Sequence, residues 1–137
     1  MIVVDTNVLI YLLVPGERTE QAERVFRRDP VWAAPLLWRS EFRNVLAVYM
    51  RRGLLSLDYA LQLINNAEIL MQDREYEISS ARILSLVAGT RCSAYDGEFV
   101  ALAQDLGLSL VTSDARLLAE FPATTIAMDI FGAWQNG

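Results

Sequence analysis

Short apolar runs rich in β-branched residues alternate along the chain with longer stretches in which apolar positions recur every three or four residues. Such runs predict buried strands, and the recurring positions predict amphipathic helices. Strands are expected at residues 2–4, 31–34, 76–78, 108–112 and 124–128. Helices are expected at residues 6–13, 17–28, 35–52, 56–71, 79–89, 93–106 and 115–118. Strands that alternate with helices imply a parallel sheet covered by helices on both faces.

Glycine and proline mark several of the expected element ends. Pro15 interrupts the first helical stretch, and Gly53 and Gly107 directly follow two later helices, as residues that end helices do. Pro35 suits the first turn of the helix expected after the second strand. The pattern contains no repeat, low-complexity tract or linker, so the sequence predicts a single domain over residues 1–137.

The residue types that the sequence lacks narrow the possible chemistry. The chain has no histidine, which excludes an imidazole base, and with Cys92 as its one thiol it does not predict a zinc site of the usual kind. All 12 cationic side chains are arginines, so the lysine of phosphate-binding loops and Schiff-base chemistry are absent too. An enzyme of this composition depends on carboxylates, hydroxyls, amides or arginine. Carboxylate oxygens favour Mg²⁺ or Mn²⁺.

The net charge of the chain and the length of its apolar runs limit the partners and the cellular location that we expect. The net charge of −5 counts against a passive nucleic-acid binder. It does not count against a metal-dependent nuclease, because bound cations supply positive charge where acids cluster. The longest apolar run, residues 8–14, is too short to cross a bilayer. The apolar start lacks a preceding cation and contains Asp5, so it does not predict a secretion signal. We therefore expect a cytoplasmic protein without a membrane partner.

Two acidic residues follow predicted strands. Asp5 interrupts the apolar run "MIVVDTNVLIYLL" just after the first strand, and Asp114 follows the strand at 108–112. Each could cap the helix behind it through a side-chain oxygen. A carboxylate at a strand end is also where an α/β sheet meets a ligand. Taken singly, the capping role is favoured for both residues.

Asp96 lies on a predicted inward face. It is the third residue after Ser93, the expected N-cap, and so fits a capping-box variant. Phe99, Val100 and Ala103 follow at helical spacing, which places Asp96 beside the apolar face rather than on the solvent face.

Glu41 falls in a predicted apolar stripe. Four apolar residues share its face at helical spacing: Leu37, Trp38, Val45 and Val48. An unpaired carboxylate there costs several kcal/mol of desolvation. Arg39 and Arg43 point elsewhere on the helix, which leaves a distant arginine as the alternative partner. Two acids at strand ends and two on inward helical faces indicate a carboxylate cage for a hard cation.

The chain resembles the PIN domain, and within it the VapC-type toxin ribonucleases of prokaryotic toxin–antitoxin pairs. The resemblance rests on "VVDTNVLIYLL", the glutamate in "WRSEFRNVL", "SAYDGEFVALAQDLGLSLVTSD" and "TTIAM", which occur in family order across nearly the whole chain. It implies a three-layer α/β/α sandwich with a central parallel five-stranded sheet. One departure is Gly97, where a bulkier residue is expected, and which we expect to loosen the start of its helix.

The resemblance also implies roles for individual residues. The catalytic, metal-binding acids are Asp5, Glu41, Asp96 and Asp114. The supporting residues are Asn7, Thr112 and Ser113. The possible RNA contacts are Arg39, Arg43 and Arg116. The implied reaction is Mg²⁺- or Mn²⁺-dependent hydrolysis of RNA phosphodiester bonds, with direct ligation by Asp5 and Asp96 as the first expectation.

The implied partners are an RNA substrate, a second copy of the chain in a homodimer, and a cognate antitoxin whose tail covers the acidic groove. Leu54, Leu55 and the helix at 57–71 offer apolar surface for such contacts, although core packing explains them equally well. Two alternatives stay open. One is a PIN-like interaction module that does not cut, and the other is a PIN nuclease acting on other nucleic acids.

Overall fold

The computed structural model describes residues 1–133, so residues 134–137 of the expected single domain lie outside the described part. Five strands form one sheet in the order β3-β2-β1-β4-β5, and every neighbouring pair is parallel. The strands are β1 (Ile2–Val4), β2 (Trp32–Pro35), β3 (Glu75–Tyr76), β4 (Leu110–Thr112) and β5 (Thr125–Ala127). The predicted central parallel sheet is confirmed.

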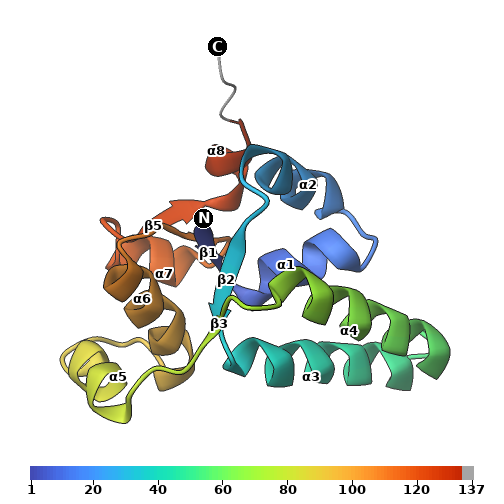
Figure 1. The fold of residues 1–137 in the computed structure, drawn as a ribbon, viewed down its shortest axis with the longest axis horizontal. Coiled ribbons are helices and arrows are strands. Elements are labelled where there is room, and N and C mark those ends of the chain that lie inside the picture. Colours follow the sequence, from blue (N-terminus) through green and yellow to red (C-terminus); the bar gives the residue numbers. More distant parts are fainter. Residues whose placement is uncertain (134–137) are drawn as a thin grey trace.

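Helices cover both faces of the sheet (Figure 1). Within residues 1–133 they are α1 (Thr6–Leu13), α2 (Thr19–Arg28), α3 (Leu37–Arg51), α4 (Leu57–Met71), α5 (Ser80–Val87), α6 (Ala94–Leu106), α7 (Ala115–Glu120) and α8 (Met128–Ala133). Helices α5, α6 and α7 lie on one side of the strands and α1 to α4 on the other. This arrangement confirms the three-layer α/β/α sandwich. None of the described helices combines the length and the apolar character needed to cross a bilayer.

The central strands are buried because helices pack on both of their faces. Val3, Ala33 and Val111 have no exposed surface, and they come from three adjacent strands. Helix α6 contacts β1, β2 and β4, and its segment 99–103 is buried throughout. Burial on both faces explains why the strands are continuous apolar runs in the sequence rather than alternating apolar and polar residues.

The strand order creates a crevice between the ends of β1 and β4. The chain builds outward from β1 to β2 and β3, and then returns to place β4 on the other side of β1. At such a reversal the connections leave in opposite directions, and ligands bind beyond the carboxyl ends of the strands. Val4 pairs with Val111, so Asp5 and Thr112 come next on the two neighbouring strands.

Some predicted boundaries were wrong, for reasons of tertiary structure. Pro35 is the last residue of β2, not part of the first helical turn, because pairing with Tyr76 of β3 keeps it extended. Helix α2 begins at Thr19 instead of residue 17, after a turn in which Gly16 N–H donates to Thr19 Oγ1 (2.9 Å). Strand β3 ends at Tyr76 rather than extending to residue 78.

The chain end also differs from the prediction. Met128, expected in the last strand, begins α8, a short helix that the pattern did not reveal. Helix α8 packs against α2, and the side chain of Arg28 lies over the ring of Phe131 at 3.9 Å. A six-residue helix has too few turns to show a clear period, and its long-range packing stabilises it.

Gly97 has a packing role in the structure. It is buried where α6 meets α5, and a β-carbon added there would lie 2.7 Å from Val87 Cγ1. The absent side chain therefore allows α5 to approach the start of α6. Close packing of α5 on α6 therefore accounts for the glycine at this position, and the loosening of the helix start stays a prediction.

Candidate active site

The four predicted acids, Asp5, Glu41, Asp96 and Asp114, line one cavity of about 230 Å³ at the ends of β1 and β4. The first follows β1 directly, the last follows β4, and the other two come from α3 and α6. The remaining lining residues are Thr6, Asn7, Ile10, Asn44 and Val45. Four carboxylates thus face a cavity that no arginine lines within the described residues.

Thr112 links two of the acids. Its hydroxyl donates a 2.8 Å hydrogen bond to Asp5 Oδ2 and accepts one of 3.0 Å from the backbone N–H of Asp114. Thr112 has no exposed surface, so water cannot replace these bonds without disturbing the core. The side chain therefore orients Asp5 and ties the end of β4 to the end of β1.

The capping alternative holds for one strand-end acid and not for the other. Asp114 Oδ1 accepts hydrogen bonds from the backbone N–H groups of Arg116 (2.8 Å) and Leu117 (3.2 Å), so this residue caps α7. Asp5 occupies the N-cap position of α1 but makes no side-chain capping bond. The carboxylate of Asp5 is thus held for a purpose other than starting its helix.

Glu41 is held by Thr6, a residue that the sequence reasoning missed. The Thr6 hydroxyl donates a 2.7 Å hydrogen bond to Glu41 Oε1. Thr6 is buried, and Leu9 and Ile10 follow it on the inward face of α1 at helical spacing. A hydroxyl on an inward apolar face, directly beside Asp5, was the signal in the sequence.

The position of Glu41 on α3 differs from the prediction. The fully buried stripe of this helix is formed by Trp38, Phe42 and Leu46. Glu41 and its neighbour Val45 lie beside that stripe and are half-buried. Glu41 therefore sits at the rim of the core, where it reaches the cavity, and its partner is a hydroxyl rather than a distant arginine.

Burial is the main cause that raises the pKa values of Asp5, Glu41 and Asp96. The charges of Asp96 and Asp114 further raise the pKa of Asp5, and the charge of Asp114 raises that of Asp96. The hydroxyls of Thr112 and Thr6 act in the opposite direction on Asp5 and Glu41. The carboxylates therefore destabilise one another when ionised, and a cation between them would remove that repulsion.

Glu98 is a further acid near the cavity that the sequence reasoning did not single out. Burial raises the pKa of Glu98, and its negative charge contributes to the raised pKa of Glu41. It lies two residues after Asp96 on α6. Position alone gave no signal, because residues two apart on a helix point in different directions.

The carboxylate oxygens at the cavity are ligands of the type that a hard divalent cation prefers, although their present spacing does not form a complete metal site. Among residues 1–133, no group of three or more acidic, cysteine or histidine side chains is placed to hold a metal ion as it stands. Each carboxylate has two oxygens, and the bonds from Thr6 and Thr112 use one oxygen of Glu41 and one of Asp5. Oxygen-only ligands with this excess of negative charge match Mg²⁺ or Mn²⁺.

The other predicted site residues are distributed around the cavity. Asn7 is exposed and lines it, whereas Ser113 is half-buried and does not. Arg43 is exposed and lines a groove against α4. Arg116 is exposed at the start of α7.

Arg39 is engaged elsewhere. Its guanidinium binds both carboxylate oxygens of Glu75 on β3, at 2.6 and 2.7 Å, and lies 3.3 Å from Glu68 Oε1 on α4. Trp38 Nε1 donates a further 2.9 Å bond to Glu75. Arg39 therefore joins α3 to β3 and α4, and it is the least available of the three arginines for RNA.

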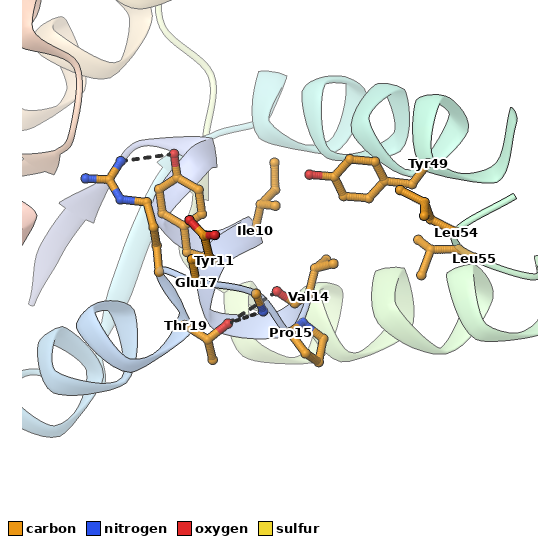
Figure 2. Close-up of a pocket in the computed structure, with 11 residues that line it drawn as sticks. Ile10, Tyr11, Val14, Pro15, Glu17, Thr19, Tyr49, Leu54 and Leu55 are labelled. Carbon is orange, nitrogen blue, oxygen red and sulfur yellow. Dashed lines mark hydrogen bonds between the residues drawn. The ribbon is translucent and has the colours of Figure 1, made fainter. Parts of the chain in front are cut away.

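A second, more apolar cavity of about 460 Å³ adjoins the acidic one. Ile10 lines both cavities. Figure 2 shows Tyr49 and Leu54 on one side of this second cavity and Tyr11 on the other, with Ile10 between them. An occupant of the apolar cavity would therefore lie next to the carboxylates.

Comparisons with known proteins bear on the fold and the family. A model of the PIN domain matches residues 2–122, so the chain belongs to the PIN domain family. Ribonuclease VapC3 from Pyrobaculum aerophilum is 33% identical over 127 residues, which cover 89% of this chain and 95% of that protein. The resemblance inferred from the sequence is confirmed.

Solved structures share the fold. The crystal structure of PAE2754 from Pyrobaculum aerophilum has a TM-score of 0.72 and 21% identity, and the match covers 95% of this chain and 92% of that one. A toxin–antitoxin complex from Klebsiella pneumoniae has a TM-score of 0.68 and 21% identity, with coverage of 93% and 98%.

Proposed function

We propose that this chain is a metal-dependent endoribonuclease that hydrolyses RNA phosphodiester bonds, and that it is the toxin of a toxin–antitoxin pair. The observation that carries the proposal is the meeting of Asp5, Glu41, Asp96 and Asp114 at one cavity, at the crevice between β1 and β4. The 33% identity to a protein named as a ribonuclease supports the choice of RNA as substrate.

The hydrogen bonds that hold each acid suggest a different role for each one. Asp5, oriented by Thr112, and Asp96 at the start of α6 would be the direct ligands of Mg²⁺ or Mn²⁺. Asp114, with Oδ1 committed to capping α7, would contribute through its other oxygen to a weaker second position. When bound, the metal supplies Lewis-acid activation of water and charge neutralisation at the phosphate.

Glu41 would take part in proton transfer. Its Oε1 accepts the hydrogen bond of the Thr6 hydroxyl, which would leave Oε2 to accept a proton from the attacking water or to hold that water by a hydrogen bond. Burial raises the pKa of Glu41, which makes it a better base than an exposed carboxylate. In-line attack of water would leave a 5′-phosphate and a 3′-hydroxyl.

RNA contacts would come from arginines beside the cavity. Arg43 is exposed on α3, the helix of Glu41, and Arg116 is exposed at the start of α7, two residues after Asp114. Arg39 would contribute only after release from Glu75. Because the acids give this region a negative charge, phosphate binding would depend on the bound metal as well as on these arginines.

The proposed partners are a second copy of the chain, in a homodimer, and an antitoxin. The chain itself would be a single domain over residues 1–137, located in the cytoplasm. Three leucines on the turn before α4 and on α4 are exposed: Leu54, Leu57 and Leu61. Exposed apolar clusters of this kind mark protein contacts. The apolar cavity that shares Ile10 with the acidic one would bring an antitoxin tail to the carboxylates.

The proposal is tested by incubating the protein with defined single-stranded RNAs in Mg²⁺, Mn²⁺ or chelator. We expect cleavage by wild type in either metal, none in chelator, and none by Asp96→Asn. Glu23→Gln, an exposed change on α2, is the matched control and should cleave normally. Cleavage that survives chelation, or equal cleavage by Asp96→Asn, would contradict the mechanism.

Two further arms separate the alternatives. Single-stranded DNA of the same sequences distinguishes a ribonuclease from a PIN nuclease with another substrate. RNA binding without any cleavage in either metal would instead favour an interaction module.

A further inference from the structure

A third cavity, of about 660 Å³, lies between the start of α6 and helix α7. Its lining includes Arg91, Cys92 and Asp96 on one side and Arg116 and Leu117 on the other. This volume is within the range of about 300–1,000 Å³ typical of small-molecule sites. It is therefore large enough for one nucleotide.

Asp96 lines this cleft as well as the acidic cavity. The two spaces thus meet at one of the carboxylates proposed to hold the metal. A chain that presents one phosphate to the acidic cavity would place the adjoining part of its backbone in the cleft. No other residue of the four acids lines both spaces.

The two arginines at the cleft are available for an anion. Both are exposed, and within residues 1–133 neither guanidinium makes a hydrogen bond or an ion pair. By contrast, the guanidiniums of Arg39 and Arg82 each bind a carboxylate. The backbone N–H of Arg91 donates to Glu120 Oε1 (2.9 Å), which anchors the segment that carries the arginine.

The charge of the cleft contrasts with that of the acidic cavity. Two arginines offset Asp96 and Glu120 in the cleft, whereas among residues 1–133 the acidic cavity is lined by four carboxylates and by no cationic side chain. A polyanion therefore finds its arginine partners in the cleft and depends on a metal in the cavity beside it.

Part of the cleft lining is uncharged, at Cys92, Ser93, Leu117 and Ala119. Burial raises the pKa of the Cys92 thiol to about 11, so the thiol adds no charge to the cleft at neutral pH. Its Sγ–H donates to the backbone oxygen of Ser93. Together with Leu117 and the exposed Ala119, this part of the lining carries no charge and suits the face of a base or a ribose.

We propose that this cleft is the subsite for the nucleotide next to the scissile phosphate of a single-stranded RNA, with Arg91 and Arg116 binding its backbone phosphate. The inference rests on the proposed ribonuclease function and adds Arg91 as a substrate-positioning residue. It assigns the two arginines to substrate binding rather than to the chemical step.

The kinetic test uses a random-sequence pool of 12-nucleotide single-stranded RNAs in Mg²⁺. For Arg91→Gln and for Arg116→Gln we expect KM to rise about tenfold, as the loss of a charged hydrogen bond does, with kcat nearly unchanged. Arg27→Gln, on exposed α2 surface away from the cleft, is the control and should leave both constants unchanged. Unchanged KM in both cleft variants would overturn the inference.

A second readout does not depend on cleavage, because Cys92 is the only thiol. In the cleavage-impaired Asp5→Asn protein, the same RNA pool should slow alkylation of Cys92 by N-ethylmaleimide severalfold. Adding Arg91→Gln and Arg116→Gln should remove the protection. Anisotropy of labelled RNA reports binding independently.

The two readouts separate the proposals. RNA that binds without protecting Cys92 would overturn the subsite, and the ribonuclease proposal would then stand on its own cleavage assay. A protein that neither cleaves nor binds RNA would overturn both.

Discussion

The hydroxyl of Thr112 donates a 2.8 Å hydrogen bond to Asp5 Oδ2, across 107 positions of sequence. The bond exists because β1 and β4 are parallel neighbours and the register pairs Val4 with Val111. One step beyond that pair, a carboxylate and a hydroxyl face each other. Orientation of Asp5 is thus a direct consequence of the strand order.

Thr112→Val tests this relationship. The change keeps the shape but leaves Asp5 Oδ2 and the Asp114 N–H without their partner, so the free energy of unfolding should fall by about 1–3 kcal/mol. RNA cleavage should fall more than the loss of folded protein explains. Urea unfolding and cleavage rates measure the two effects.

Thr125→Val, on β5, is the matched control, because the Thr125 hydroxyl donates to the carbonyl oxygen of Phe121 at the end of α7 and contacts none of the four acids. It should lower stability without a separate effect on activity. Equal activity of Thr112→Val and wild type would contradict the orienting role.

Asp96→Asn should raise the stability of the metal-free protein at neutral pH. A carboxyl whose pKa is raised by folding destabilises the folded state above that pKa, and the effect vanishes below the ordinary value of 3.8. The gain should therefore be up to about 1 kcal/mol near pH 7, after screening by solvent, and absent near pH 3.

Urea unfolding in chelator as a function of pH measures this gain. Glu23→Gln should show no such gain. Saturating Mg²⁺ should reverse the order, because it stabilises wild type more than the variant. A loss of stability in metal-free Asp96→Asn at pH 7 would show that the residue has a mainly structural role.

Gly97→Ala should destabilise the protein by about 1–3 kcal/mol, although alanine is the better helix former. The new β-carbon would lie 2.7 Å from Val87 Cγ1, so α5 would have to shift. Val87→Ala in the same chain should recover most of the loss. A double-mutant cycle without coupling between the two positions would contradict close α5–α6 packing as the cause.

Glu75→Gln should remove part of the acid sensitivity of folding. Hydrogen bonds from Arg39, and then from Trp38, hold the pKa of Glu75 below its ordinary value of 4.5. Such a group stabilises the fold above pH 4.5, and the contribution is lost as pH falls through the lowered pKa. Wild type should therefore be more stable than Glu75→Gln at pH 7, and the difference should shrink below pH 4.

The exposed change Glu77→Gln is the control. A difference in free energy of unfolding between wild type and Glu75→Gln that is the same at all pH values would contradict the account.

The fold could be predicted from the sequence because its strands are continuous apolar runs and its helices have clear periods. Ile2–Val4 and Leu110–Thr112 are buried on both faces and show this directly. Pro35 and Met128 could not be placed, since pairing with β3 and packing against α2 decide their conformations. These are contacts between distant segments, which local pattern does not encode.

The gathering of the four acids was predictable, and Thr112, which donates to Asp5, was among the expected supporting residues, but Thr6 was not. Asp5 and Asp114 follow strands, and parallel strands end at one edge. Thr6 was missed because its role depends on α3 approaching α1 closely enough for a 2.7 Å bond to Glu41. The position of Glu41 beside the buried stripe of α3 could not be predicted either. Which side of α3 faces the sheet decides that the stripe runs through Trp38, Phe42 and Leu46.

The central claim is that the carboxylates act together as one cation site, and a Mn²⁺ titration followed by electron paramagnetic resonance tests it most directly. Wild type and the exposed control Glu23→Gln should bind Mn²⁺ saturably with equal affinity. Asp5→Asn should bind at least tenfold more weakly, and Mg²⁺ should displace Mn²⁺ from wild type. Equal affinity in Asp5→Asn, or no saturable binding by wild type, would contradict the account.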